Sequence, residues 1–157
     1  MTRPERTRLA LTALVLAGGT LAVAAGALAG PGAASCDGQP ATRPIGADGT
    51  AGPDVLVGTA GSETIHGWGG NDLVCGRGGN DILYGDTGPD RMFGQGGADR
   101  VEGGDQGDFL DGGAGNDTLK GGNGLDTVIG GPGRDIGDGG PGSDNCFVEV
   151  RFVCEGD

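Results

Sequence analysis

Single apolar residues return every nine positions along most of the chain, with more variable residues on either side. Counted in nines from Gly49 to Phe147, eleven blocks follow without insertion, and the eighth position is apolar in ten of them. Gly137 is the exception, and the ten are Leu56, Ile65, Val74, Leu83, Met92, Val101, Leu110, Leu119, Val128 and Cys146. The last three positions of a block alternate outward, inward and outward. This alternation predicts short strands with one buried residue each.

The segments between the predicted strands have fixed glycine and acidic positions. Glycine stands at the first position in all eleven blocks and at the fourth in ten, where Gln106 is the exception. The sixth position is acidic in all eleven: Asp54, Glu63, Asp72, Asp81, Asp90, Asp99, Asp108, Asp117, Asp126, Asp135 and Asp144. Glycine reaches left-handed backbone angles without strain, so it suits tight turns that aim carbonyl groups inward. A period this regular predicts a repeat structure.

Blocks such as GGAGNDTLK (112–120) and GGNGLDTVI (121–129) resemble the nonapeptide of repeats-in-toxin, or hemolysin-type, calcium-binding proteins. The resemblance implies an all-β fold, namely a parallel β-roll that resembles a β-helix solenoid and is capped at both ends. Two blocks make one coil, and stacked coils complete one another's sheets. The chain is therefore interpreted as a short secreted form of this family.

The resemblance also implies that the eleven acidic residues are calcium ligands on two ladders, with ions held between blocks i and i+2. The odd-numbered blocks supply Asp54, Asp72, Asp90, Asp108, Asp126 and Asp144, and the even-numbered blocks supply Glu63, Asp81, Asp99, Asp117 and Asp135. The ladders have nine gaps between them, so several calcium ions and at most nine are expected. Thr50, Thr59, Gln106 and the longer Glu63 depart from the motif and make blocks one, two and seven the weakest sites.

Carbonyl and carboxylate oxygens suit calcium, which takes about six to eight oxygen ligands. Zinc prefers nitrogen or sulfur, and the chain has a single histidine, His66. Carboxylates brought close together along a ladder repel one another, so the metal-free chain is expected to be expanded and calcium to drive its folding.

Composition alone favours a disordered polymer, because 39 glycines and 35% hydrophobic residues leave little for a conventional core. The regular period overrides that interpretation. The net charge of −12 argues against nucleic acid as a partner and favours cations.

The first residues have the layout of a secretory signal peptide. Three arginines precede an apolar run from Leu9 to about Ala25, and small residues offer a cleavage site near Ala29. The alternatives are an N-terminal membrane anchor and a lipoprotein with Cys36 as the lipidated residue. Cleavage leaves no membrane span in the mature chain, so we expect a secreted, extracellular protein, with or without association with the cell surface.

The expected domains are a signal peptide (1–29), an N-terminal linker or cap (30–48), eleven repeats (49–147) and a C-terminal cap (148–157). All four cysteines follow the predicted leader, which agrees with export. We expect the disulfides Cys36–Cys75 and Cys146–Cys154, although four cysteines allow three pairings. The residues between Cys146 and Cys154 alternate and predict a short hairpin or cap.

The outward positions of the odd-numbered blocks are more apolar than a solvated surface: Val55, Val57, Leu73, Phe93, Phe109, Ile129 and Phe147. Either residues 36–48 cover this sheet, which is favoured, or it contacts a protein or surface partner. No HExxH, GxSxG or nucleotide-loop motif occurs, so neither catalytic activity nor catalytic residues are expected. The leading interpretation is a monomeric calcium-binding protein, and the alternative is a calcium-stabilised structural or adhesive protein.

Overall fold

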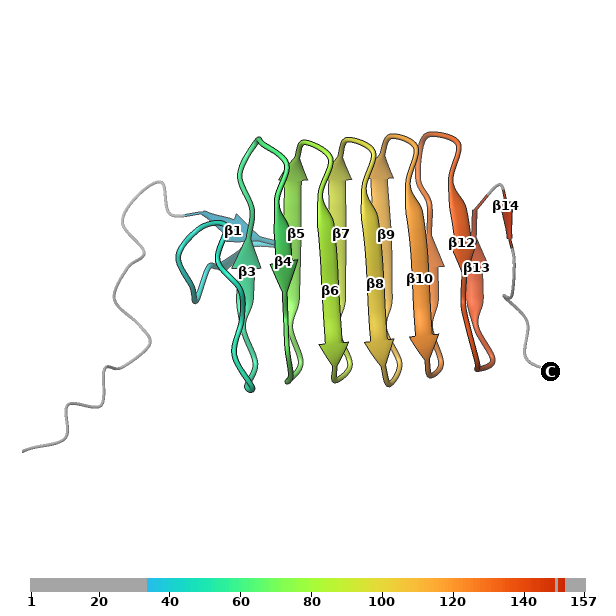
Figure 1. Ribbon diagram of the computed structural model, residues 1–157, viewed down its shortest axis with the longest axis horizontal. Coiled ribbons are helices and arrows are strands. Elements are labelled where there is room, and N and C mark those ends of the chain that lie inside the picture. The colour runs from blue at the N-terminus through green and yellow to red at the C-terminus, as the bar shows by residue number, and fades with distance from the viewer. Residues whose placement is uncertain (1–33, 149, 152–157) are drawn as a thin grey trace, which may run out of the picture.

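The computed structural model describes residues 34–148, 150 and 151, which form an elongated stack of coils (Figure 1). These residues contain no helix. The strands are β1 (Ser35–Cys36), β2 (Gln39–Pro40), β3 (Val55–Val57), β4 (Thr64–His66), β5 (Leu73–Gly78), β6 (Ile82–Thr87), β7 (Arg91–Gly96), β8 (Arg100–Asp105), β9 (Phe109–Ala114), β10 (Thr118–Asn123), β11 (Thr127–Ile129), β12 (Ile136–Asp138), β13 (Asn145–Phe147) and β14 (Val150–Arg151).

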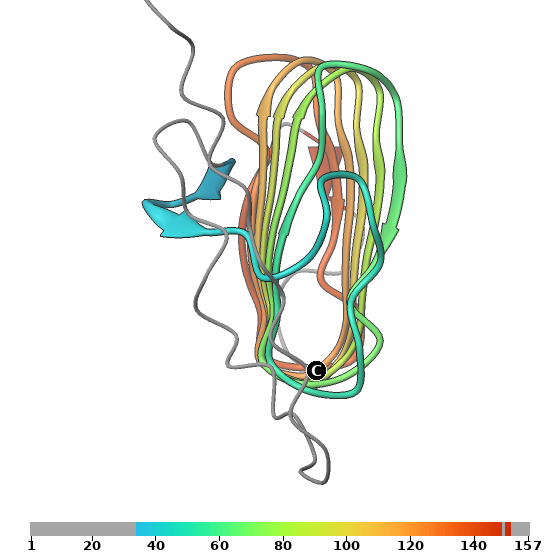
Figure 2. The ribbon, with the colours of Figure 1, turned by 90° about the vertical axis from the view of Figure 1, so that its left-hand side faces the viewer.

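Two parallel sheets of six strands form the walls of the stack. One has the order β13-β11-β9-β7-β5-β3, here called the odd sheet, and the other has the order β14-β12-β10-β8-β6-β4, here called the even sheet. Each strand pairs with the strand two further along, as where Val74 lies opposite Met92. Figure 2 shows the coils superimposed along the stack, with one wall on each side. The predicted all-β parallel β-roll, with two blocks to a coil, is confirmed.

The central strands are longer than the sequence pattern predicts. Strands β5 to β10 have six residues, because each continues from the seventh position of one block to the third position of the next. Pairing therefore extends into the glycines, as where Gly78 lies opposite Gly96. Backbone groups make this pairing whatever the side chain, so the alternation of apolar and polar residues cannot reveal it.

The core between the sheets is one residue deep. The ten apolar residues of the eighth position form a single cluster and are 0–6% exposed. Gly137 interrupts this column, and Val148 packs against the cluster there. A Cβ atom added to Gly137 would lie 2.7 Å from Cγ2 of Val148. Val148 therefore occupies the space that a larger side chain at position 137 would need.

The N-terminal segment covers one end of the odd sheet. Strands β1 and β2 form an antiparallel pair, and Ala34 and Cys36 pack against Val55, Val57 and Leu73. The expected disulfide between Cys36 and Cys75 is present, with 5.6 Å between the Cα atoms. It spans 39 residues. On the chain-entropy model, a loop of that length contributes about 4 kcal/mol to stability.

Backbone hydrogen bonds cover the open edge of β3. The amides of Thr42 and Gly46 donate to the carbonyl groups of Val55 and Val57, each at 2.9 Å. The favoured prediction, that residues 36–48 cover the odd sheet, is thus confirmed for its first strands. At the other end of the sheet, the Phe147 side chain remains 60% exposed.

The C-terminal end differs from the hairpin that was one of two expectations. Strand β14 pairs in parallel with β12, while β13 belongs to the opposite sheet, so β13 and β14 do not form a hairpin. Cys146 is disulfide-bonded, but Cys154 lies outside the described residues, and the Cys146–Cys154 pairing stays a prediction. The predicted signal peptide also lies outside them. Among the described residues, no helix is long and apolar enough to cross a membrane.

Candidate functional site

The sixth-position carboxylates form two buried rows, one for each sheet. Ten of them are aspartates, and each of these is at most 8% exposed. Each stands directly before a strand, so the regular stacking of the coils repeats its position every 18 residues. Burying ionised carboxylates is costly unless donors or cations compensate them. The partners of each oxygen therefore decide what the rows can do.

One oxygen of each carboxylate is used within the protein. In the nine acidic residues from Asp54 to Asp126, the amide donates to Oδ1 of the aspartate 18 residues later, for example from Asp72 to Asp90 at 2.8 Å. The same bond, at 2.8 or 2.9 Å, links every pair from Asp54–Asp72 to Asp126–Asp144. Sequence reasoning assigned whole carboxylates to a metal and missed this pairing, since it depends on how the coils stack.

The second oxygen is different. In eight aspartates, Oδ2 is buried and has no hydrogen-bond partner among the described residues: Asp72, Asp81, Asp90, Asp99, Asp108, Asp117, Asp126 and Asp144. A carboxylate oxygen in that position lacks the donor that burial normally requires. Among the described residues, buried side-chain oxygens without a hydrogen-bond partner therefore gather in these two rows.

In seven of the eight, all except Asp144, this oxygen lies beside a backbone carbonyl of the next coil. A Cβ atom added to Gly67 would be 2.6 Å from Oδ2 of Asp72 and 2.7 Å from the carbonyl oxygen of Gly85. The invariant glycine of the first position is therefore needed for space and not for its backbone angles. It leaves two oxygens from neighbouring coils facing the same point, which is an arrangement suited to a cation.

Left-handed backbone angles occur instead at the second and fourth positions of the block. Gly70, at the fourth position, has φ 126°. At the second position φ is positive in all blocks from the third onward, including the non-glycine residues Trp68, Arg77, Asp86 and Gln95. Gln106 also adopts φ 80° in place of glycine. Block seven was expected to be a weak site, but its Asp108 keeps the hydrogen bonding of its neighbours.

The buried aspartates resist ionisation. Burial raises the pKa of Asp72 and Asp117 to about 6 and that of Asp90 and Asp108 to about 7. Backbone hydrogen bonds oppose this effect, and neighbouring carboxylates of the same row add to it. Burial also raises the pKa of the aspartates Asp81, Asp99 and Asp126. A cation would reverse this by favouring the ionised form.

The donor set fits a hard cation. No group of three or more His, Cys, Asp or Glu side chains comes together within the described residues. A metal in these rows must therefore take carbonyl oxygens as well as carboxylates, which is the ligand set of calcium. The nitrogen and sulfur ligands that zinc prefers are not present in the rows. The residues of the later coils thus fit calcium.

The first coil, blocks one and two, satisfies its carboxylates in another way. The amide and hydroxyl of Thr50 both donate to Oδ2 of Asp54 at 2.8 Å. The Thr59 amide donates to Oε2 of Glu63 at 2.8 Å, and its hydroxyl donates to Oε1. These bonds hold the pKa of Glu63 below its ordinary value. The signal is visible in the sequence, as a threonine four residues before the acid.

A third threonine ends the odd row. No preceding coil is available to donate to Oδ1 of Asp54, and the Thr42 hydroxyl donates to it at 2.9 Å. The same hydroxyl accepts from the Val55 amide at 2.8 Å. Both oxygens of Asp54 are therefore satisfied without a metal.

A comparison with protein families agrees with this arrangement. The family model described as RTX calcium-binding nonapeptide repeat (4 copies) matches residues 48–83, 76–110 and 111–146, together more than half of the chain. These stretches contain all eleven acidic residues of the two rows. No curated protein and no solved structure matches the chain.

Proposed function

The chain belongs to the RTX calcium-binding nonapeptide repeat family, and from this premise we propose that it is a secreted protein that folds around calcium and catalyses no reaction. RTX repeats bind calcium in a β-roll. The observation that supports coupling to folding is the set of eight buried Oδ2 atoms without a donor. Without a cation, repulsion between the ionised carboxylates of a row destabilises the stacked coils. The free energy of calcium binding therefore contributes directly to the free energy of folding.

The ions would lie between successive coils. Oδ2 of an aspartate in one coil and the first-position carbonyl of the next coil supply oxygens, as at Asp72 and Gly85. Calcium bound there would neutralise the row and let its carboxylates ionise at neutral pH. The hydrogen bonds to Oδ1 that link successive coils are made within the chain and do not involve the ion.

The threonines reduce the number of sites. Because Thr50 and Thr59 already donate to Asp54 and Glu63, the first gap of each ladder needs no ion. Four gaps then remain on the odd ladder and three on the even ladder. We therefore expect at most seven calcium ions, where the repeat count alone allows nine.

An extracellular location is supported by the disulfide between Cys36 and Cys75. Structural disulfides form and persist in oxidising compartments, and calcium is abundant outside cells. Calcium-coupled folding would then begin after export. The expected signal peptide in residues 1–29 is consistent with this route.

Absence of catalysis is supported by the uniformity of the carboxylates. An acid and a base need different surroundings so that their pKa values separate. Here the aspartates of successive coils repeat the same hydrogen bonds and the same burial. Such repetition is what metal ligands need.

The alternative function is a calcium-stabilised structural or adhesive protein. The uncovered end of the odd sheet supports it, because Phe147 is 60% exposed and Phe109 and Ile129 face outward beyond the N-terminal segment. Sedimentation of the calcium-loaded protein over a range of concentrations separates the two. A monomer that binds no apolar dye would exclude the adhesive alternative.

Titration with calcium, followed by circular dichroism and calorimetry, tests the main proposal. The metal-free protein should lack most of its β signal and gain it as calcium is added, with no more than seven ions bound. A metal-free protein that is already fully structured would contradict coupled folding. Nine bound ions would instead contradict the role of the threonines.

A further inference from the structure

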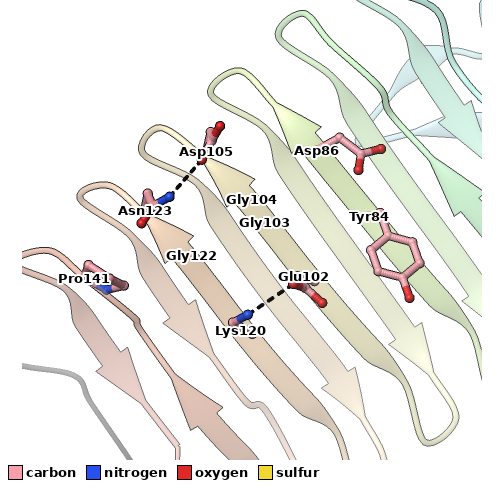
Figure 3. Close-up of a pocket in the computed structure, with 10 residues that line it drawn as sticks. All are labelled: Tyr84, Asp86, Glu102, Gly103, Gly104, Asp105, Lys120, Gly122, Asn123 and Pro141. Atoms are coloured by element: carbon pink, nitrogen blue, oxygen red, sulfur yellow. Dashed lines mark hydrogen bonds and ion pairs between the residues drawn. The ribbon is translucent and has the colours of Figure 1, made fainter.

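The outer face of the even sheet carries a trench that none of the row carboxylates lines. It has a volume of about 330 Å³, and glycines of β8 and β10 form its floor (Figure 3). One rim is the Lys120–Glu102 ion pair at 3.2 Å, and the other is the Asn123–Asp105 hydrogen bond at 2.9 Å. The trench therefore runs across neighbouring strands, with polar side chains along both rims.

Three stacked rings lie at one end of this trench. Tyr84 lines the trench, and the His66 ring stacks on it with 4.5 Å between centroids. The Trp68 ring also stacks on the His66 ring, with 5.0 Å between their centroids. The Trp68 side chain is 54% exposed. A large aromatic ring held rigidly and left in water provides a flat apolar platform for a ligand.

Backbone strain is present at this end, as it also is at Arg77 and Gln95 on the odd sheet. Trp68 and Asp86 have φ values of 71° and 70°, at a position where blocks seven to eleven have glycine. Holding a non-glycine residue there costs about 1–3 kcal/mol, which the surrounding contacts must offset. Asp86 fixes the platform, since its Oδ2 accepts from the Trp68 amide and contacts Nδ1 of His66, both at 3.2 Å.

We propose that the trench and its aromatic platform bind an uncharged glycan chain. A pyranose ring has an apolar C–H face that stacks on an aromatic ring, and its hydroxyl groups at the ring edge pair with carboxylates and amides. The rims offer such groups at Glu102, Asp105 and Asn123. Neighbouring strands lie about 4.8 Å apart, close to the length of one pyranose, so successive sugars can lie over successive strands.

Charge argues against the other polymers that could lie in this trench. The carboxylates of Asp86, Glu102 and Asp105 line it, so an acidic polysaccharide would meet like charges there. A basic peptide would need unpaired carboxylates. Each of the three is already engaged, by His66, Lys120 and Asn123 respectively. Sugar hydroxyls can share such oxygens, because they both donate and accept.

The single tryptophan makes the proposal directly measurable. The full chain, loaded with calcium so that the roll is folded, is titrated with cellohexaose and chitohexaose while Trp68 emission and binding heat are followed. Stacking of a sugar on Trp68 should shift its emission to the blue, with saturable binding of at least one probe. Absence of saturable binding of both would overturn the proposal, as would binding only of oligogalacturonate or hexalysine.

A matched pair of variants locates the site. Trp68→Gly removes the ring and restores the family residue, so the calcium-loaded circular dichroism should be unchanged while calorimetry shows binding about tenfold weaker or lost. Gln95→Gly makes the same change at φ 74° on the odd sheet and should bind normally. Equal effects of the two would contradict the site. Tyr84→Thr should also weaken glycan binding. Because the circular dichroism of the calcium-loaded variants should be unchanged, a loss of glycan binding can be told apart from a failure of calcium-coupled folding.

Discussion

The first coil and the coils that follow it compensate the same buried carboxylates by different means. In residues 49–66, threonine hydroxyls and amides donate to Asp54 and Glu63. In the later coils the second position is no longer threonine, and Oδ2 of aspartates such as Asp90 has no donor. The comparison shows that a hydrogen-bond donor within the chain can compensate a buried carboxylate in the first coil, whereas in the later coils a cation is needed for this.

The first coil also has apolar support from the N-terminal segment, which a disulfide fixes in place from the second coil. The disulfide joins the N-terminal segment to Cys75, and Val55 and Val57 are buried beneath that segment. Coils of a repeat protein are stabilised mainly by their neighbours, so one stable coil offers an edge on which the next can form. We expect calcium-driven folding to proceed from this end of the chain.

The largest expected effect comes from removing a carboxylate in the middle of a ladder. Asp117→Asn should lower the free energy of unfolding of the calcium-loaded protein by about 3–5 kcal/mol, as when one partner of a buried ion pair is lost. It should also remove at least one bound ion. The metal-free protein should become more stable, because a buried charge has gone. Calorimetric titration and thermal unfolding with and without calcium measure these changes.

Asp54→Asn is the matched control for this prediction. Its carboxylate is satisfied by Thr42 and Thr50, so the number of bound calcium ions should not change. An equal loss of ions in both variants would show that the first coil binds calcium like the others.

A smaller effect is expected from Thr50→Val. This change leaves Oδ2 of Asp54 without its hydroxyl donor, which should cost about 1–3 kcal/mol whether or not calcium is present. Thr118→Val, at an exposed position of β10, should change stability very little. Chemical unfolding with and without calcium measures the free energy of unfolding of both variants. A loss of stability in Thr50→Val that disappears when calcium is added would contradict the prediction.

Acidification should stabilise the later coils when calcium is absent. Burial raises the pKa of Asp90 and Asp108 to about 7 in the folded chain, so the folded state binds more protons than the unfolded state from about pH 4 to about pH 7. Stability is therefore present below that range and is lost as pH rises through 7. Calcium-stripped protein should gain β signal between pH 8 and pH 5.5, and a loss of signal on acidification would oppose this account.

The smallest change in stability is expected from Thr50→Gly, which gives block one the glycine pair of the family motif. The lost hydroxyl costs stability without calcium, but Oδ2 of Asp54 then keeps only the amide of residue 50 as a donor and comes closer to the situation of Asp72. One additional calcium ion should bind, which offsets the loss. Calorimetry that finds an unchanged number of ions would mean that the hydroxyl is not what excludes calcium.

The sequence predicted the features that repeat, because each depends on one block alone. The apolar column ending at Cys146 and the repeat structure follow from the period of nine, while the β-roll and its two acidic ladders were implied by the resemblance to RTX repeats. The features that need a neighbouring coil could not be predicted. The amide of Asp72 meets Oδ1 of Asp90 only after stacking, and the space beside Gly67 is limited by the carbonyl of Gly85.

Local departures from the pattern were informative but their meaning was incomplete. Thr50 and Thr59 were recognised as irregular, yet a one-dimensional pattern does not show that a hydroxyl at the second position reaches the acid four residues later. Likewise, the gap at Gly137 is filled by Val148 from outside the repeats. Both the threonine hydrogen bonds and the packing of Val148 are tertiary contacts, and a repeating sequence pattern does not reveal them.

Hydrogen exchange, resolved by segment and followed by mass spectrometry with and without calcium, tests the contrast between the coils most directly. The account predicts that amides of residues 49–66 stay protected in the metal-free protein, whereas those of residues 85–129 are protected only when calcium is bound. Equal loss of protection in both segments on calcium removal, or equal retention, would contradict it.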